Sequence, residues 1–435
     1  MEWEQAYQDK LCTAEEAARL VKSGETVFFG TASSQPYRLA EALYQRREEL
    51  TDVTVCTGLT VRPLPYFTPE AKGHFSTLTY FAGPGERRGI QCGQTQFTSF
   101  HLSQVDLWCR ETAHPDVAFL EVSPPDGEGN MSYGAYGVSM HDAIRACARR
   151  IVLQVNRFVP YVFGERNTIH VSQADAIVEA DEPLDEFLAP EFDETLQRMS
   201  RFIVDQIPDG ATIQLGIGGV SGAVGLGLRE KNDLGVHSEM LSDSMMELIE
   251  AGVITNRAKS FFPGKAVAGF AFGSRALYRF IDRNPELYFA PYTFVNDPRV
   301  IAQNDNMISV NTAMAVDLYG QVYADCIGGR QQSAVGGQLD YVRGAQMSKG
   351  GKSFLALPST WKTWDGETRS RIVLQAELGS AVTTPRADVQ YVVTEYGCVN
   401  LKPLTMSQRA QALIGLAHPD FREKLTEDAG YQRLL

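Results

Sequence analysis

Glu239 ends a short apolar run downstream of a glycine-rich loop. The loop follows the predicted strand 211–215 and places Gly216, Gly218 and Gly219 before a helix of small residues. Glycine lets a backbone approach a ligand closely, and the first N–H groups of the following helix attract an anion. A carboxylate beside such a loop can attack a thioester that the loop holds. The stretch therefore predicts a thioester-binding cradle with Glu239 as its nucleophile.

Pattern alone leaves other interpretations of this stretch open. The loop could be a plain strand-to-helix turn, or a dinucleotide fingerprint, although Ser221 stands where the third glycine of that fingerprint belongs. A glutamate at a strand end is most often a solvated surface residue. His237 would face the same way as Glu239, either packing or donating a hydrogen bond, because side chains alternate along a strand.

The elements that must position Glu239 occur twice in the chain. Each match follows the same order, and Gly58 falls where Glu239 falls in the second copy. Strands and helices alternate with short links, which is typical of parallel sheets. The matched pairs are 23–30 with 209–216, 52–59 with 233–240, and 126–132 with 317–323.

This repeat predicts an α/β protein of two tandem, structurally similar α/β domains with mainly parallel open sheets. We expect an N-terminal domain over 1–185 and a C-terminal domain over 186–435 that carries the glutamate. The acidic, proline-containing stretch 179–195 is the predicted linker. The Gly/Pro-rich stretch 80–94 is predicted to be a loop.

Composition and charge exclude several classes of protein. A net charge of −13 argues against nucleic acid as a partner. Without a signal-peptide pattern or a long apolar run, we expect a cytoplasmic protein that makes no membrane contact. The seven cysteines are scattered and fit a reducing compartment. The histidines lack metal-ligand spacing, so no metal is expected.

A second glycine-rich stretch, 334–351, carries two Gly-Gly pairs together with Arg343 and Lys349. These residues could line an anionic ligand, because glycine exposes backbone N–H groups and the two side chains are cationic. From pattern alone, an ordinary loop is an equally good interpretation.

Taken together, the motifs resemble family I coenzyme A transferases, on the acetyl-CoA hydrolase / 4-hydroxybutyrate CoA-transferase branch. The resemblance covers nearly the whole chain and is far more specific than a single glycine loop. Its strongest pieces are IPDGATIQLGIGGV (207–220), DLGVHSEMLSD (233–243), NPELYFAPYTFVNDP (284–298), VGGQLDYVRGAQMSKGGK (335–352) and VTTPRADVQYVVTEYG (382–397).

The resemblance implies a role for each matched position. Glu239, in the motif HSEM, would be the nucleophile, and the N–H groups of Val220 and Gly337 would form the oxyanion hole. Coenzyme A would be a substrate, with no cofactor bound permanently, and the chain would form a homodimer or a higher homo-oligomer. The residues implied to contact coenzyme A are Gly216, Ile217, Gly218, Gly219, Val220, Met314, Gly337 and Lys349.

The predicted activity is transfer of coenzyme A between a short-chain acyl-CoA and a small carboxylic acid, through a glutamyl-CoA thioester. Glu239 is expected to be ionised at pH 7, so that it needs no general base. The nearest alternative is an acyl-CoA hydrolase that uses the same glutamate. A nicotinamide-dependent oxidoreductase is a distant alternative, and a non-catalytic CoA sensor would leave Glu239 dispensable.

Overall fold

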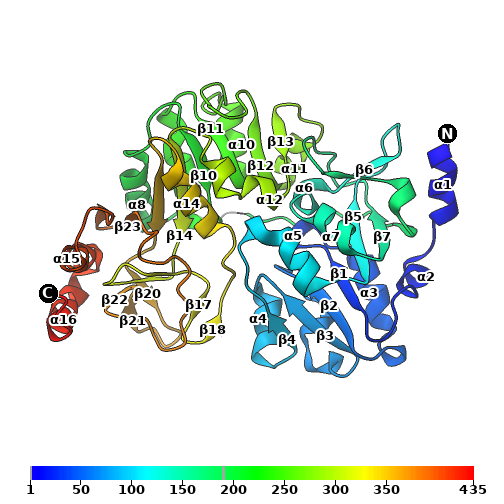
Figure 1. The fold of residues 1–435 in the computed structure, drawn as a ribbon, viewed down its shortest axis with the longest axis horizontal. Coiled ribbons are helices and arrows are strands. Elements are labelled where there is room, and N and C mark those ends of the chain that lie inside the picture. Colours follow the sequence, from blue (N-terminus) through cyan, green and yellow to red (C-terminus); the bar gives the residue numbers. More distant parts are fainter. Residues whose placement is uncertain (1, 189–191) are drawn as a thin grey trace. The chain divides into compact units, whose positions relative to one another are not determined.

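The computed structural model describes residues 2–188 and 192–435, which form two compact units (Figure 1). The first unit comprises the described residues up to Leu188 together with Leu241–Asp243 and Val267–Val295. The second comprises residues 192–240 together with Ser244–Ala266 and Asn296–Leu435. Because segments of the second half of the chain pack with the first unit, the contiguous division at residues 185 and 186 stays a prediction.

The first unit is built on a 7-stranded sheet in the order β4-β3-β2-β1-β5-β7-β9. All its neighbouring strands are parallel, and the chain starts at β1, builds outward to β4, and then returns to the other side with β5. This doubly wound order creates a switch point between β1 and β5. The strands are β1 (Thr26–Phe29), β2 (Val53–Thr57), β3 (Phe75–Thr79), β4 (Thr95–Phe97), β5 (Val117–Val122), β7 (Arg150–Val155) and β9 (Ala176–Glu179).

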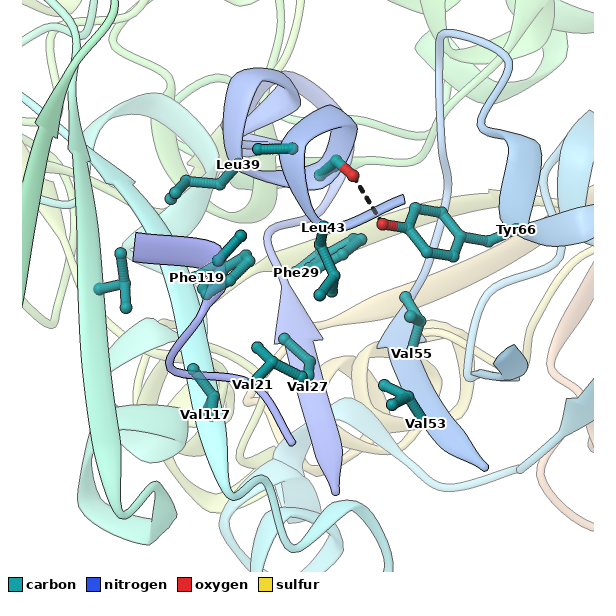
Figure 2. Packing of buried hydrophobic residues seen from close by; sticks show 14 of the residues in the cluster. Val21, Val27, Phe29, Leu39, Leu43, Val53, Val55, Tyr66, Val117 and Phe119 are labelled. Atoms are coloured by element: carbon teal, nitrogen blue, oxygen red, sulfur yellow. Dashed lines mark hydrogen bonds between the residues drawn. The ribbon is translucent and has the colours of Figure 1, made fainter. Parts of the chain in front are cut away.

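Apolar side chains from these strands and from α3 (Tyr37–Gln45) form the core of the first unit (Figure 2). Phe29 stacks on Phe119 with ring centroids 5.7 Å apart. The Tyr66 hydroxyl donates to the Ala40 carbonyl at 2.6 Å, so this buried aromatic residue keeps a polar partner. Strands covered on both faces explain the near-continuous apolar runs in the sequence.

In the second unit, the strands run in the order β11-β10-β14-β19-β23-β24. Neighbouring strands are parallel except the edge strand β24, which is antiparallel to β23. Helix α14 (Gln338–Met347) packs against β14 and β19, and α8 (Glu194–Val204) packs against α9 (Gly219–Gly227). The strands are β10 (Thr212–Leu215), β11 (Gly235–Leu241), β14 (Met307–Thr312), β19 (Lys352–Ala356), β23 (Tyr391–Thr394) and β24 (Gly397–Asn400).

Further helices and strands complete the described chain. The remaining helices are α1 (Glu2–Lys10), α2 (Ala14–Ala18), α4 (Pro84–Gln91), α5 (Val105–Trp108), α6 (Gly134–Gly137), α7 (His141–Cys147), α10 (Asp243–Glu250), α11 (Arg275–Ile281), α12 (Tyr292–Val295), α13 (Pro298–Ile301), α15 (Met406–Leu416) and α16 (Pro419–Tyr431). The remaining strands are β6 (Asn130–Ser132), β8 (Thr168–His170), β12 (Ala266–Ala271), β13 (Leu287–Phe289), β15 (Ala315–Asp317), β16 (Val322–Tyr323), β17 (Cys326–Ile327), β18 (Arg330–Gln331), β20 (Thr360–Lys362), β21 (Thr368–Ser370) and β22 (Ile372–Val373).

Strand register confirms the predicted internal repeat. In the first unit Thr26 pairs with Thr54, and in the second the matched Thr212 pairs with Gly235. The residues that lead into β2 and β11 are also alike, because Asp52 and Asp233 both adopt a φ of 53°. The two units therefore share a backbone plan, as the sequence predicted.

A matched turn gives independent support for the repeat. The Asp126 carboxylate accepts the N–H of Asn130 at 2.9 Å, and the Asp317 carboxylate accepts the N–H of Gln321 at 2.9 Å. A tyrosine hydroxyl donates to each aspartate at 2.8 Å, from Tyr161 in the first unit and from Tyr323 in the second.

The prediction that the stretch 80–94 is a loop is wrong in part, because Pro84–Gln91 forms α4. Pro84 starts this helix, and the buried Glu86 carboxylate accepts the Thr60 N–H at 2.8 Å, a tertiary contact that no local pattern encodes. The predicted linker 179–195 lies partly outside the described residues. Within the described chain, the helices are too short or too polar to cross a bilayer.

Candidate active site

The glycine loop after β10 lies against the end of β14. A Cβ built on Gly216 would lie 3.1 Å from Asn311 Oδ1 and 3.4 Å from the Val310 carbonyl oxygen, so a side chain there would crowd β14. Gly218 adopts a φ of 121°, a conformation that other residues rarely take. Both glycines therefore serve the sharp exit from β10, which lets α9 begin directly at the carboxyl edge of the sheet.

The first turn of α9 presents backbone N–H groups at this edge. Its first intrahelical hydrogen bond joins the Gly222 N–H to the Gly218 carbonyl at 3.2 Å. The N–H groups of Gly219, Val220 and Ser221 precede that bond and have no partner within the helical ladder. No side chain caps this helix N-terminus. The arrangement suits an anion or a developing oxyanion, because the helix dipole also favours negative charge there.

Glu239 lies on β11, the strand next to β10. Ile213 of β10 pairs with Val236 of β11, so Gly216 and Glu239, each three residues further on, lie at the same level of the sheet. One carboxylate oxygen of Glu239 accepts a hydrogen bond from Asn296 Nδ2 at 2.7 Å. The Gly337 N–H donates to the same carboxylate. Two fixed donors thus hold the side chain at the carboxyl edge.

Gly337 precedes α14 and must be a glycine where it stands. A Cβ at this position would lie 2.0 Å from Glu239 Oε2 and 2.2 Å from Asn296 Nδ2. These separations are far below van der Waals contact, so any side chain would displace the carboxylate or the amide. The structure therefore brings the two glycine-rich stretches of the sequence together around Glu239.

Burial raises the pKa of Glu239 to about 7. Desolvation of the charged form is the largest cause, the hydrogen bond from Asn296 and the N–H of Gly337 oppose it, and the nearby Asp340 carboxylate raises it further. The expectation of a fully ionised carboxylate at pH 7 is therefore wrong. A half-buried glutamate with such a pKa is typical of an active site rather than of a solvated surface.

His237 is fully buried two residues before Glu239. Its ring faces Tyr341 of α14, with centroids 6.5 Å apart and an interplanar angle of 56°. It therefore contributes to the packing of β11 on α14.

Met314 lies just beyond the end of β14, at the same carboxyl edge. Its N–H donates to the Tyr323 carbonyl at 2.8 Å, and its own carbonyl accepts a bond from Arg371 at 3.1 Å. Its contact with coenzyme A stays a prediction.

Lys349 does not lie in this site. It follows the C-terminus of α14, whereas Gly337 precedes the N-terminus, and a helix of ten residues is about 15 Å long. The Lys349 carbonyl accepts the N–H of Asn306, which stands just before β14, so Lys349 lies at the opposite edge of the sheet. Its exposed ammonium pairs with Asp305 at 3.7 Å. Lys349 therefore lies away from Glu239, beyond the far end of α14, and its contact with a CoA phosphate stays a prediction.

Asn296 is the residue that sequence reasoning missed. It lies within NPELYFAPYTFVNDP, a stretch quoted for the resemblance, but no local pattern distinguishes it from a capping or turn asparagine. It is fully buried, and its partner Glu239 is 57 residues away in the sequence. Among the described residues, no cluster of histidine, cysteine, aspartate and glutamate could hold a metal ion.

Comparison with known proteins identifies the family. Residues 1–188 match the acetyl-CoA hydrolase/transferase N-terminal domain, and residues 273–429 match the C-terminal domain of the same family. The chain is 40% identical to a 4-hydroxybutyrate coenzyme A transferase of Clostridium kluyveri, over 98% of this chain and 99% of that protein. It is 38% identical to a butyryl-CoA:acetate CoA-transferase of Anaerostipes caccae, over 99% and 98%.

Solved structures agree with this assignment. The crystal structure of RipA from Yersinia pestis covers all of both chains with a TM-score of 0.92 and 37% identity. A 4-hydroxybutyrate CoA-transferase from Porphyromonas gingivalis gives a TM-score of 0.84 and 36% identity, over 99% of this chain and 100% of that one. The chain therefore belongs to the acetyl-CoA hydrolase/transferase family, on the 4-hydroxybutyrate CoA-transferase branch, and is an enzyme of the CoA-transferase class.

Proposed function

We propose that the enzyme moves coenzyme A between a short-chain acyl-CoA and a small carboxylate by ping-pong chemistry, with Glu239 as the covalent nucleophile. The observation that carries the proposal is the geometry around Glu239. Its carboxylate is held by Asn296 Nδ2 and the Gly337 N–H, at the level of the glycine loop that opens α9. A carboxyl group with a pKa near 7 and two fixed donors is poised to act as a nucleophile.

In the first step, the Glu239 carboxylate attacks the carbonyl carbon of the donor thioester. The negative charge that develops on the substrate oxygen requires preorganised donors, and we assign this role to the first-turn N–H of Val220. Such donors stabilise the transition state because they are fixed before the charge appears. Departure of the CoA thiolate leaves a mixed anhydride between the donor acid and Glu239.

In the second step, the thiolate attacks the glutamyl carbonyl carbon and releases the donor acid. The oxyanion now forms on an oxygen of Glu239 itself, and the carboxylate of this residue accepts hydrogen bonds from Asn296 and Gly337. We therefore assign the Gly337 N–H to the oxyanion of the glutamyl group. The product is a glutamyl-CoA thioester, and an acceptor carboxylate reverses the two steps to form the new acyl-CoA.

A carboxylate suits this chemistry better than a serine or cysteine would. The intermediate must be a thioester of an enzyme carboxyl group, so that the free energy of the substrate thioester is kept rather than lost to water. Desolvation raises the pKa of the free Glu239 carboxyl group, and exclusion of water by the bound substrates would protect the intermediate from hydrolysis. At neutral pH, a fraction of the enzyme molecules carries a protonated Glu239, which must lose its proton before the first step.

We propose acetate, butyrate and related small acids as the substrate class. The names of the relatives include 4-hydroxybutyrate, butyrate and acetate, which share one carboxylate and a short carbon chain. No cofactor is required for the steps above, since coenzyme A is itself the group transferred. A cytoplasmic homodimer, built from domains 1–185 and 186–435, is part of the same proposal.

Trapping of the intermediate tests the proposal directly. Incubation with acetyl-CoA without an acceptor acid, followed by borohydride, should modify a single peptide, the one that contains Glu239. Mass spectrometry of a proteolytic digest locates the modification. The Glu239→Gln variant is the matched control and should remain unmodified. Modification of a different peptide in the wild-type enzyme, such as one with Cys326, would exclude the scheme.

Hydrolysis is a second candidate, because the matched family covers hydrolases as well as transferases. Both activities would pass through the same glutamyl-CoA thioester. They differ in whether water or an acceptor carboxylate attacks that thioester. CoA release from acetyl-CoA, measured with and without added butyrate, separates them. A transferase forms butyryl-CoA and releases little free CoA, whereas a hydrolase releases CoA equally in both reactions.

A further inference from the structure

A cavity of about 500 Å³ in the first unit is lined by none of the residues described around Glu239. Its volume is within the usual range for small-molecule sites. Its lining combines arginine and apolar side chains, none of which has a role in the acyl transfer described above. Among them are Arg157, Phe158, Leu184, Arg275, Tyr278 and Arg279.

The lining is basic although the protein is strongly acidic. Three arginines and one aspartate, Asp282, line the cavity of a chain whose net charge is −13. Arg275 and Arg279 stand four residues apart on α11, and therefore on one face of that helix. Two like charges at this spacing repel each other, so an anion between them would relieve an unfavourable interaction.

The three guanidinium groups of this cavity are exposed to solvent, and one of them, Arg279, has no ion-pair partner among the described residues. Arg279 is exposed and forms no hydrogen bond or ion pair with any described residue. Arg275 pairs with Glu186 at 2.8 Å and Arg157 pairs with Asp181 at 3.3 Å, with both arginine side chains about two-thirds exposed. Ion pairs this exposed contribute little and exchange readily with another anion.

The apolar part of the lining offers a flat platform. The Phe158 ring is 43% exposed, and the Arg157 guanidinium lies over it at 5.1 Å from the ring centroid. Leu184 and Tyr278 are buried beside it, and the Tyr278 hydroxyl donates to the Asp185 carbonyl at 2.7 Å, which fixes this wall. An exposed ring next to cations favours a ligand with a planar apolar group as well as negative charge.

A neighbouring cavity shows that this lining is specific to one site. It has a volume of about 590 Å³ and shares Arg157, but its charged side chains are mainly the carboxylates of Glu4, Glu179 and Asp181. A cavity of this kind repels anions. The sign of the charge therefore separates two cavities of similar size in the same unit.

We propose that the arginine-lined cavity binds a nucleoside phosphate, with the phosphate between Arg275 and Arg279 and the base stacked near Phe158. A bidentate guanidinium matches the geometry of a phosphate, and a base can stack on any aromatic face. The nucleotide end of coenzyme A and a free adenine nucleotide carry the same chemistry. The experiment distinguishes these two sources.

Isothermal titration calorimetry of the full-length enzyme tests the proposal with three probes: ATP, adenosine 3′,5′-bisphosphate and inorganic phosphate. The wild-type enzyme should bind a nucleotide, and Arg279→Glu should lose that binding event or weaken it at least tenfold. Arg19→Glu is the matched control, because Arg19 is exposed, lies in the same unit and lines neither cavity. It should bind as the wild type does.

Phe158→Ala separates the two parts of the ligand. It should weaken nucleotide binding and leave the weak binding of inorganic phosphate unchanged. Tighter binding of the bisphosphate identifies the nucleotide end of coenzyme A as the ligand, and tighter binding of ATP identifies a free nucleotide. Equal nucleotide binding by wild type and Arg279→Glu would overturn the proposal. Since the measurement uses no acyl group, Glu239→Ala should leave it unchanged, and the result is independent of the proposed transfer activity.

Discussion

The two copies of the repeat differ in which side chains occupy the carboxyl edge of the sheet. In the second unit β11 carries Glu239 near its carboxyl end, and in the first unit the matched residue, Gly58, directly follows β2. A Cβ at Gly58 would lie 3.1 Å from the ring of Tyr80, so that ring occupies the space a side chain would need. The Tyr80 hydroxyl is itself bonded to Thr31 Oγ1 at 2.5 Å and to Met140 Sδ at 3.0 Å.

The loops after the first strand of each copy also differ. After β1, Ala32–Ser34 forms a tight turn in which Ser34 Oγ accepts the Thr31 N–H at 3.1 Å. A Cβ at Gly30 would lie 1.8 Å from the Ser34 carbonyl oxygen, so this turn folds back onto the strand. After β10, by contrast, α9 starts with N–H groups that its own ladder does not use. One backbone plan thus carries a filled edge in one copy and an open, donor-rich edge in the other.

This difference teaches that duplication supplied the position of the nucleophile but not its environment. Strand register fixes the level at which Glu239 and Gly58 stand. The hydrogen-bond donors to Glu239, its pKa and the space around it depend on the segments that follow the strands, and these segments differ between the two copies. Substitutions at Glu239, Gly337, Asn296 and Gly58 test which of these features makes the two copies different.

The largest effect is expected from Glu239→Ala, which makes the second copy resemble the first. Without a carboxylate no covalent intermediate can form, so the transfer rate should fall by about 10³-fold or more. Formation of butyryl-CoA from acetyl-CoA and butyrate measures it. Glu247→Gln, an exposed glutamate of the same unit that pairs with Arg229, is the control and should retain full activity. Comparable rates in the two variants would contradict the assignment of Glu239.

The next largest effect is expected from Gly337→Ala. The added methyl group would lie 2.0 Å from Glu239 Oε2, so the carboxylate must move away from its donors. We expect a loss of about 10²–10³-fold in kcat, comparable with removal of an oxyanion-hole donor. Gly415→Ala has nothing within 4 Å of the new methyl group and lies in the exposed face of α15, so its activity should not change. Equal kcat values for the two variants would contradict the prediction, because they would show that the Glu239 carboxylate can move away from a methyl group at position 337 without loss of activity.

Asn296→Ala should change the pH dependence more than the maximal rate. In the wild type, activity should rise with pH and reach half of its maximum near pH 7, because the carboxylate form is the reactive one and the pKa of Glu239 is raised to about 7. Loss of the Asn296 donor removes an interaction that lowers this pKa, so the half-maximum should move to higher pH. At pH 7 we expect about a tenfold loss, and a smaller one at pH 9. A profile of kcat/KM against pH identical to that of the wild type would disprove the role of Asn296.

The same pKa shift links stability to pH. The pKa of Glu239 in the folded enzyme is above that of an unfolded chain, so its contribution to stability is full at acidic pH and is lost as pH rises through 7. Glu239→Gln should therefore gain stability over the wild type at pH 8, by about 1–2 kcal/mol. Urea unfolding at pH 5 and pH 8 measures the difference, which should be small at the lower pH. A gain equal at both values would show that the charge of Glu239 is not its cause.

The smallest effect is expected from Gly58→Ala in the first copy. The new methyl group would meet the Tyr80 ring at 3.1 Å, and we expect a loss of about 1–2 kcal/mol in the free energy of unfolding as the ring shifts. Gly127→Ala has nothing within 4 Å and a φ outside the left-handed region, and serves as the control. Unchanged stability of Gly58→Ala would mean that the space beside β2 is open, and that the two copies differ less than proposed.

Particular residues show how far sequence reasoning reached. The repeat, the glycine loop and the unusual position of Glu239 could be predicted, because strand periodicity and glycine spacing are local properties of the chain. The stretch 80–94 was misread, because its helix depends on Glu86 bonding to the distant Thr60 N–H. The separation of Lys349 from Glu239 could not be predicted, because α14 lies between Gly337 and Lys349 and sequence proximity hides its length.

By itself, the sequence determined the α/β plan, its duplication and the one copy that carries an acid at the strand end. These follow from apolar periodicity and from glycines, which act within a few residues. The tertiary structure alone decided that Asn296 and the Gly337 N–H meet the Glu239 carboxylate, and that its pKa rises to about 7. Desolvation and hydrogen bonding depend on which distant segments pack around a group, and the order of residues along a chain does not encode those distances directly.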